Sequence, residues 1–219
     1  MKTKHVLMVT ATSVLVVMAL LYVAISPKSS ESSANAARSV DARAALERMS
    51  AVTIGAPAAK VHIVEFLDPA CETCRDFYPL VKKIMADNPD RIRLSVRLIA
   101  FHNGSDFVVR LLYAARKQDQ FWPVLTRLLA TQQAWAINHT VQPDLVWQQV
   151  TSLGLDDQQL RKDMESPEVA AAATQDMQDA KALKVTQTPE FFVNGQGLPT
   201  FGYEQLQGLV ADALARAYP

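Results

Sequence analysis

The sequence of 219 residues lacks an excess of charge of either sign and has little cysteine and glycine. Its 22 Lys and Arg residues balance 22 Asp and Glu residues, which gives no reason to expect a nucleic-acid partner. Seven Gly residues and no repeat at a solenoid period exclude collagen-like and repeat architectures. With two cysteines, Cys71 and Cys74, the fold cannot be a disulfide scaffold. A hydrophobic fraction of 49% instead predicts a mostly globular chain.

Charge is also absent from one long apolar run, Val6 to Ile25. As a helix this run would reach about 30 Å, the thickness of a bilayer core. Lys2 and Lys4 precede it, so the positive-inside rule predicts export of the chain after Pro27. A signal peptide cleaved near residues 34–36 is the alternative, but its apolar part is usually about 7 to 15 residues long. We therefore expect residues 1–27 to be a cytoplasmic start and an uncleaved membrane anchor.

Residues 28–53 are predicted to be a linker. Ser29 to Ala37 are small and mostly polar, which is typical of a flexible tether. Val40 to Met49 can form a short helix that either docks on its own domain or pairs with a second copy through residues 38–50. The sequence leaves both possibilities open.

A βαβ unit is predicted within residues 54–105. Val61 to Leu67 are almost all apolar, which indicates a central strand buried on both faces. Apolar spacing from Phe77 to Met85 predicts a helix that begins at the two cysteines. Apolar and polar residues alternate from Arg91 to Ile99, which predicts a second strand with one buried face.

Residues 106–183 have helical periodicity and predict an inserted all-helical domain of at least three helices. Residues 184–219 are predicted to complete the first part of the fold. Glu190–Val193 and Leu198–Phe201 flank an Asn-Gly-Gln-Gly segment that indicates a hairpin, and a final amphipathic helix follows. The fold class is therefore α/β.

The Cys-x-x-Cys motif serves both zinc sites and redox sites. A structural zinc needs about four N or S ligands. The exported part offers three histidines, none at ligand spacing from a second partner: His62, His102 and His139. A structural disulfide is disfavoured because so short a loop constrains the unfolded chain little. Dithiol redox chemistry without a metal is therefore predicted.

Each sulfur has its own predicted role. Cys71 faces the free N–H groups at the start of the helix, which favours its thiolate and makes it the nucleophile. Cys74, one turn later, can resolve a mixed disulfide by attacking Cys71. Glu65 lies in the buried strand, where an ionisable group is costly, and we hypothesise that it relays protons for Cys74. The alternative is an edge glutamate whose carboxylate reaches water.

These residues resemble the DsbA-like thiol-disulfide oxidoreductases. The stretch IGAPAAKVHIVEFLDPACETC is similar to the strand, acidic residue and Cys-x-x-Cys of that family, and TPEFFVNG is similar to its Thr-cis-Pro segment and hairpin. Phe121-Trp122, Leu128-Leu129, Gln132 and Trp135 resemble its helical insertion. Over Ile54 to Ala217 the resemblance implies a thioredoxin-like fold with an inserted all-helical domain, here preceded by one N-terminal transmembrane helix.

The resemblance also implies a site and a setting. Pro189 would be cis and pack against the cysteines, leaving the backbone of Thr188 open to an extended substrate. The domain would face the periplasm from a bacterial inner membrane and act on exported proteins. Its membrane partner would be a quinone-linked oxidase or a thiol-reductant transporter. No cofactor other than the redox-active Cys71–Cys74 disulfide is implied.

Three departures from the family lie beside the Cys-x-x-Cys motif and beside Pro189. Glu72-Thr73 replaces pairs such as Pro-His, and the charge of Glu72 should disfavour the Cys71 thiolate and make the enzyme less oxidising. Gln187 and Glu190 add bulk beside Pro189 and predict a narrower choice of partners.

Several functions remain compatible with these residues, because the same dithiol can donate, reshuffle or reduce disulfides. A copper-binding metallochaperone using both thiolates is one alternative. Cis Pro189 and the lack of a nearby His or Met ligand argue against it. A redox-inert periplasmic chaperone is the other. We expect His102 to be an ordinary surface-loop residue and Trp135 to pack in the helical domain.

Overall fold

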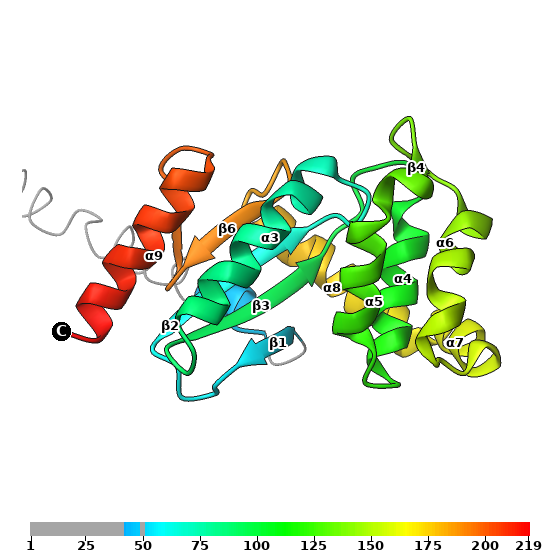
Figure 1. Cartoon of the computed structure of the whole chain (residues 1–219), viewed down its shortest axis with the longest axis horizontal. Coiled ribbons are helices and arrows are strands. Elements are labelled where there is room, and N and C mark those ends of the chain that lie inside the picture. Colours follow the sequence, from blue (N-terminus) through cyan, green and yellow to red (C-terminus); the bar gives the residue numbers. More distant parts are fainter. Residues whose placement is uncertain (1–41, 49–50) are drawn as a thin grey trace, which may run out of the picture. The chain divides into compact units, whose positions relative to one another are not determined.

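The computed structural model of the chain describes residues 42–48 and 51–219 (Figure 1). The predicted anchor over residues 1–27 and most of the predicted linker lie outside the described residues. Among the helices that are described, none combines the length and the apolar character that a membrane span requires.

A mixed five-stranded sheet lies at the centre of the fold, with the strand order β1-β3-β2-β6-β7. The strands are β1 (Val52–Gly55), β2 (Val61–Leu67), β3 (Ile92–Leu98), β6 (Glu190–Val193) and β7 (Gln196–Gly197). The middle strand, β2, is parallel to β3 and antiparallel to β6. Every residue of β2 is buried, which confirms the prediction of a central strand covered on both faces.

Helix α3 (Glu72–Asp87) connects β2 to β3 and completes the predicted βαβ unit. Cys71 is its N-cap residue and Pro79 lies inside it. Helix α9 (Tyr203–Ala217) follows the hairpin, as predicted. The two cysteines therefore stand at the N-terminus of α3, next to the carboxyl end of the central strand.

The two faces of β2 bury different clusters, because successive side chains of a strand point to opposite sides. Ile63 and Leu67 pack with residues of α3 and α9. Val64 and Phe66 pack with Leu46 and with residues of α8 (Pro167–Ala182) and the loop after it. Position 65 shares the face of positions 63 and 67, so Glu65 is directed to the side of the sheet that α3 covers.

The chain between β3 and β6 forms the predicted helical part, at the right of Figure 1. Besides α8 it contains α4 (Ser105–Arg116), α5 (Phe121–Ala130), α6 (Pro143–Val150) and α7 (Asp157–Met164). The prediction that it is all-helical is wrong, because β4 (Ala136–Ile137) and β5 (Thr140–Val141) form a small hairpin. Asn138 and His139 make its turn with left-handed φ values of 50° and 58°. Strands of two residues each carry no detectable periodicity.

The prediction that the second strand of the C-terminal hairpin is Leu198–Phe201 is also wrong. Strand β7 is Gln196–Gly197, and the turn consists of Asn194 and Gly195 with φ values of 48° and 84°. An Asn-Gly pair favours such a two-residue turn because both positions need positive φ. The hairpin therefore closes two residues earlier than the alternation suggested.

The prediction that β3 has one exposed face is wrong as well, because Arg97 is completely buried. Its guanidinium donates to Asp176 Oδ1 at 2.5 Å, Asp179 Oδ2 at 2.6 Å and the carbonyl oxygen of Ala45 at 2.6 Å. Arg48 donates to the same Asp179 at 2.7 and 2.8 Å. Residues 42–46 are helical and, as one predicted alternative had it, dock on their own domain.

Breaking this network should destabilise the fold strongly. We expect Arg97→Ala to lower the free energy of unfolding by about 3–5 kcal/mol, because it leaves the buried carboxylate of Asp176 without its cationic partner and Asp179 with Arg48 alone. Lys83→Ala removes an exposed ion pair with Asp87 and should leave stability nearly unchanged. Urea denaturation followed by circular dichroism measures both. Equal losses in the two variants would contradict the assignment.

Candidate active site

The two sulfurs lie where the chain passes from β2 into α3. Cys71 is 6% exposed, Cys74 is fully buried, and both thiols are free. The Cys71 thiol donates to the carbonyl oxygen of Thr188 at 3.3 Å, across 117 residues of sequence. The Thr188–Pro189 bond is cis, as the resemblance implied. The fold thus brings both predicted segments, the cysteine motif and the Thr-Pro segment, to one place.

The environment separates the acidities of the two thiols. The hydrogen bond with Cys74 is the largest cause that lowers the pKa of Cys71 to about 6; Thr188 and the charge of His102 add to it, and burial opposes it. Burial, together with the bond and charge of Cys71, raises the pKa of Cys74 well above its ordinary value. At pH 7 one sulfur is therefore a thiolate while the other keeps its proton.

The residues between the cysteines do not prevent this separation. Thr73 is half-buried in the first turn of α3. The carboxylate of Glu72 lies 3.3 Å from Nδ1 of His139. Hydrogen bonding lowers the pKa of Cys71 in the presence of Glu72, and the expectation that Glu72 makes the enzyme less oxidising than one with Pro-His stays a prediction.

Glu65 is completely buried, and neither of its carboxylate oxygens has a hydrogen-bond partner among the described residues. The alternative that its carboxylate reaches water is therefore wrong. Burial, and then the charge of Cys71, raises its pKa to about 8, so that it is mostly uncharged at pH 7. The charge of Glu65 in turn contributes to the raised pKa of Cys74. A neutral acid so close to two thiols is suited to proton transfer.

Asp68 organises the loops around the cysteines, and the sequence analysis missed it. Its fully buried carboxylate accepts five hydrogen bonds. The donors are Ala70 N (2.8 Å), Phe101 N (2.7 Å), His102 N (2.9 Å), His102 Nδ1 (2.9 Å) and Ser105 Oγ (3.1 Å). An acidic residue directly after a buried strand and before the motif was the available signal.

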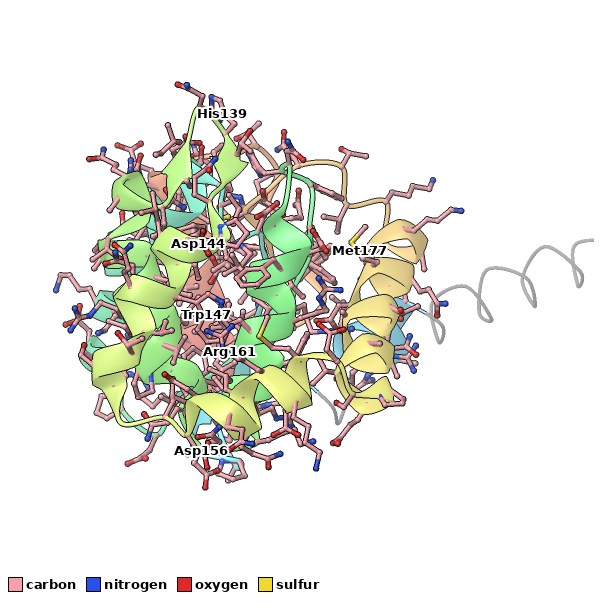
Figure 2. All side chains as sticks on the ribbon, turned by 90° about the vertical axis from the view of Figure 1, so that its right-hand side faces the viewer. His139, Asp144, Trp147, Asp156, Arg161 and Met177 are labelled. Atoms are coloured by element: carbon pink, nitrogen blue, oxygen red, sulfur yellow. The ribbon has the colours of Figure 1, made fainter. Side chains whose placement is uncertain are left out.

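The histidines require a correction. His102 was expected to be an ordinary loop residue, but it is bound to Asp68, and its charge acts on Cys71. Burial opposes its ionisation, yet the bond to Asp68 prevails and raises its pKa. One ligand atom each from Glu72, His102 and His139 lie within 4.8 Å of one another, so the expectation that no histidine meets a second ligand is wrong. The β4–β5 hairpin supplies His139 (Figure 2).

Three further residues, Gln132, Trp135 and His62, are held by hydrogen bonds away from the two sulfurs. Gln132, just after α5, donates through Nε2 to the carbonyl oxygens of Pro69 at 2.8 Å and Cys71 at 2.9 Å. Trp135 is fully buried and donates to the carbonyl oxygen of Leu128 at 2.9 Å, as expected of a packed residue. His62 is buried within 2.8 Å of the Ser95 hydroxyl in the sheet. The helical part thus holds the backbone of the first cysteine directly.

A groove of about 760 Å³ lies along α8 and the segment that follows it, up to Thr186. Its lining includes Phe101 and Thr186. Met177 of α8, labelled in Figure 2, contributes to the wall. Gln187 is exposed and Glu190 is half-buried, on either side of buried Pro189.

The thioredoxin family model matches residues 47–212. A thioredoxin-like oxidoreductase from Silicibacter pomeroyi DSS-3 is 32% identical, with 78% of this chain and 96% of that chain covered and a TM-score of 0.68. Oxidised BdbD from Bacillus subtilis shares the fold at 22% identity and a TM-score of 0.65, with 76% and 94% covered.

A curated relative, the Na⁺/H⁺ antiporter NhaA of Herminiimonas arsenicoxydans, is 29% identical over 140 residues. The match covers 64% of this chain and 22% of that protein. The chain spans less than a quarter of the length of the curated relatives it matches.

The lowered pKa of Cys71 should be visible in its reactivity. In the reduced protein, we expect the rate of Cys71 alkylation by iodoacetamide to rise with pH around a midpoint of about 6. An ordinary thiol has a midpoint of about 8.5. Cys74→Ala removes the largest cause of the shift, so its midpoint should move upward. Mass spectrometry of the alkylated peptide measures both. Identical midpoints in the two proteins would count against this hydrogen bond.

Proposed function

Because the chain belongs to the thioredoxin family, as a DsbA-like thiol-disulfide oxidoreductase, we propose that Cys71 and Cys74 exchange disulfides with exported proteins. The observation that carries the proposal is the geometry of the pair. One nearly buried thiol contacts the backbone of Thr188, and the second lies fully buried one turn further along α3. This arrangement offers one sulfur to a partner and keeps the other for resolution.

In the oxidising direction, a client thiolate attacks Cys71 of the Cys71–Cys74 disulfide. The bond between the two cysteines breaks, a mixed disulfide forms, and Cys74 leaves and takes up a proton. A second client thiolate then attacks the client sulfur and releases Cys71 as a thiolate. The client loses two electrons and gains a disulfide, while the enzyme becomes a dithiol. Reduction is the same sequence reversed, and neither direction needs another cofactor.

We assign the proton transfer at Cys74 to Glu65. A thiolate released in this apolar setting is costly, because burial disfavours the charged form. Glu65 is largely protonated at pH 7 and can donate to Cys74 during oxidation and accept the proton during reduction.

The Thr188–Pro189 segment is proposed to receive the client. An extended peptide can pair with the backbone of Thr188 beside Cys71 with little dependence on its side chains. Apolar residues in the groove along α8, among them Phe101 and Met177, suit unfolded chains with exposed hydrophobic side chains. Gln187 and Glu190 flank this position and would restrict which clients fit.

The setting that we propose is extracytoplasmic, with the domain tethered to a bacterial inner membrane by residues 6–25. The charge-free run and the lysines before it support this orientation. A membrane redox partner, either a quinone-linked oxidase or a thiol-reductant transporter, would restore the cysteine pair.

The redox state of Cys71 and Cys74 in intact cells distinguishes these two partners. It is measured by alkylation after an acid quench. Oxidised cysteines indicate a disulfide donor, and reduced cysteines indicate a reductase or isomerase.

Two cysteine variants test the exchange itself. We expect Cys71→Ser to lose exchange completely, because it removes the attacking sulfur. Cys74→Ser should still attack but accumulate mixed disulfides, because nothing resolves them. Non-reducing electrophoresis with a disulfide-containing client separates the two outcomes. Undiminished client folding by Cys71→Ser would instead favour the redox-inert chaperone, whereas mixed disulfides in that variant would make Cys74 the attacking sulfur.

The role of Glu65 has a separate test. We expect Glu65→Gln to slow the steps at Cys74 by about 10²-fold, the lower range for general acid–base catalysis. In the wild type, proton donation to Cys74 should decline as pH rises through about 8, where Glu65 ionises, and the variant should lack this decline. Stopped-flow measurements at several pH values resolve these steps. Glu204→Gln, at an exposed position of α9, is the control. An unchanged pH profile would contradict the assignment.

A further inference from the structure

We propose that Glu72, His102 and His139 form a binding site for a divalent transition-metal cation of the zinc class, beside the cysteine pair. The three side chains come from the start of α3, the loop between β3 and α4, and the turn of the β4–β5 hairpin. One ligand atom from each lies within 4.8 Å of the other two. Two imidazoles and one carboxylate are a ligand set that zinc accepts in proteins.

The spacing of one ligand pair already fits a metal. Nδ1 of His139 and Oε1 of Glu72 are 3.3 Å apart. In a tetrahedral site with bonds of about 2.0–2.2 Å, neighbouring ligand atoms lie roughly 3.4 Å apart. The side chains of His139 and Glu72 are 70% and 41% exposed, so small rotations can bring them and His102 around one cation.

The hydrogen bond of His102 supplies an independent reason. Its Nδ1 lies 2.9 Å from Oδ2 of Asp68, whose carboxylate is fully buried. An ionised carboxylate only accepts hydrogen bonds, so Nδ1 carries the proton and Nε2 keeps a free lone pair. Histidines that bind metals commonly have this arrangement, in which a carboxylate fixes the ring and its tautomer. Four other donors hold Asp68, so the ring starts from a fixed position.

The hairpin that carries His139 is fixed against the loop that carries His102. Val141 N donates to the carbonyl oxygen of Asn103 at 3.0 Å, one residue from His102. The rings of His102 and His139 stack with their centroids 6.1 Å apart. His139 lies at the tip of this hairpin (Figure 2), and its side chain is 70% exposed, so solvent can reach it. The backbone therefore keeps the two imidazoles together.

The donor atoms indicate which cation fits. Nitrogen with oxygen suits zinc-like cations, whereas calcium and magnesium prefer oxygen alone and copper(I) prefers sulfur. Three protein ligands leave a fourth position for water. The site thus differs from a copper carrier that uses the thiolates of Cys71 and Cys74, because its ligands include neither sulfur.

Calorimetric titration of the oxidised full-length protein with Zn²⁺ tests the site, because the disulfide removes both thiols as ligands. We expect one Zn²⁺ per chain, with His139→Ala and Glu72→Gln each weakening binding tenfold or more. Glu204→Gln is the matched carboxylate control and should bind like the wild type. The double variant Cys71→Ser/Cys74→Ser should also keep the site, although it cannot exchange disulfides.

Two outcomes would overturn the proposal. The first is binding by His139→Ala and Glu72→Gln as tight as that of Glu204→Gln. The second is binding that requires free thiols, which would move the metal to Cys71 and Cys74. Because the double cysteine variant lacks exchange entirely, failure of the metal site and failure of the redox function are read in separate measurements.

Discussion

The buried carboxylate of Asp68 is the interaction on which the active-site end of the molecule depends. A charge without solvent must be compensated, and five donors from three segments compensate this one. Those segments are the turn before Cys71, the loop at Phe101 and His102, and the start of α4. Their meeting at one carboxylate sets where the first sulfur and the nearby imidazole lie, and the chemistry follows from that placement.

Around this anchor, three ionisable groups in one apolar region acquire different protonation states. Hydrogen bonding, chiefly with Cys74, lowers the pKa of Cys71, whereas Cys74 and Glu65 are so deeply buried that their neutral forms prevail. Groups whose pKa values are driven apart by their surroundings are suited to acid and base roles. The asymmetry therefore comes mainly from burial and hydrogen bonding.

The helical insertion is part of the site as well as of the fold. Gln132 holds the carbonyl oxygen of Cys71, and the β4–β5 hairpin brings His139 to Glu72. On the other face of the sheet, α8 supplies two carboxylates to Arg97, and the segment at Arg48 joins them. Contacts on both faces of the sheet therefore couple the insertion to the strands that position the cysteines.

Local pattern by itself determined the buried central strand, the helix that begins at the cysteines and the Asn-Gly hairpin, because burial and turn geometry repeat over a few residues. It failed at Arg97, whose alternation predicted solvent, because its carboxylate partners lie 79 and 82 residues away. Asp68 and His102 likewise meet across 34 residues. Whether a charge is buried, paired or available as a ligand depends on which distant segment packs against it. Only the tertiary structure decides that, since periodicity reports which face is apolar but not what covers it.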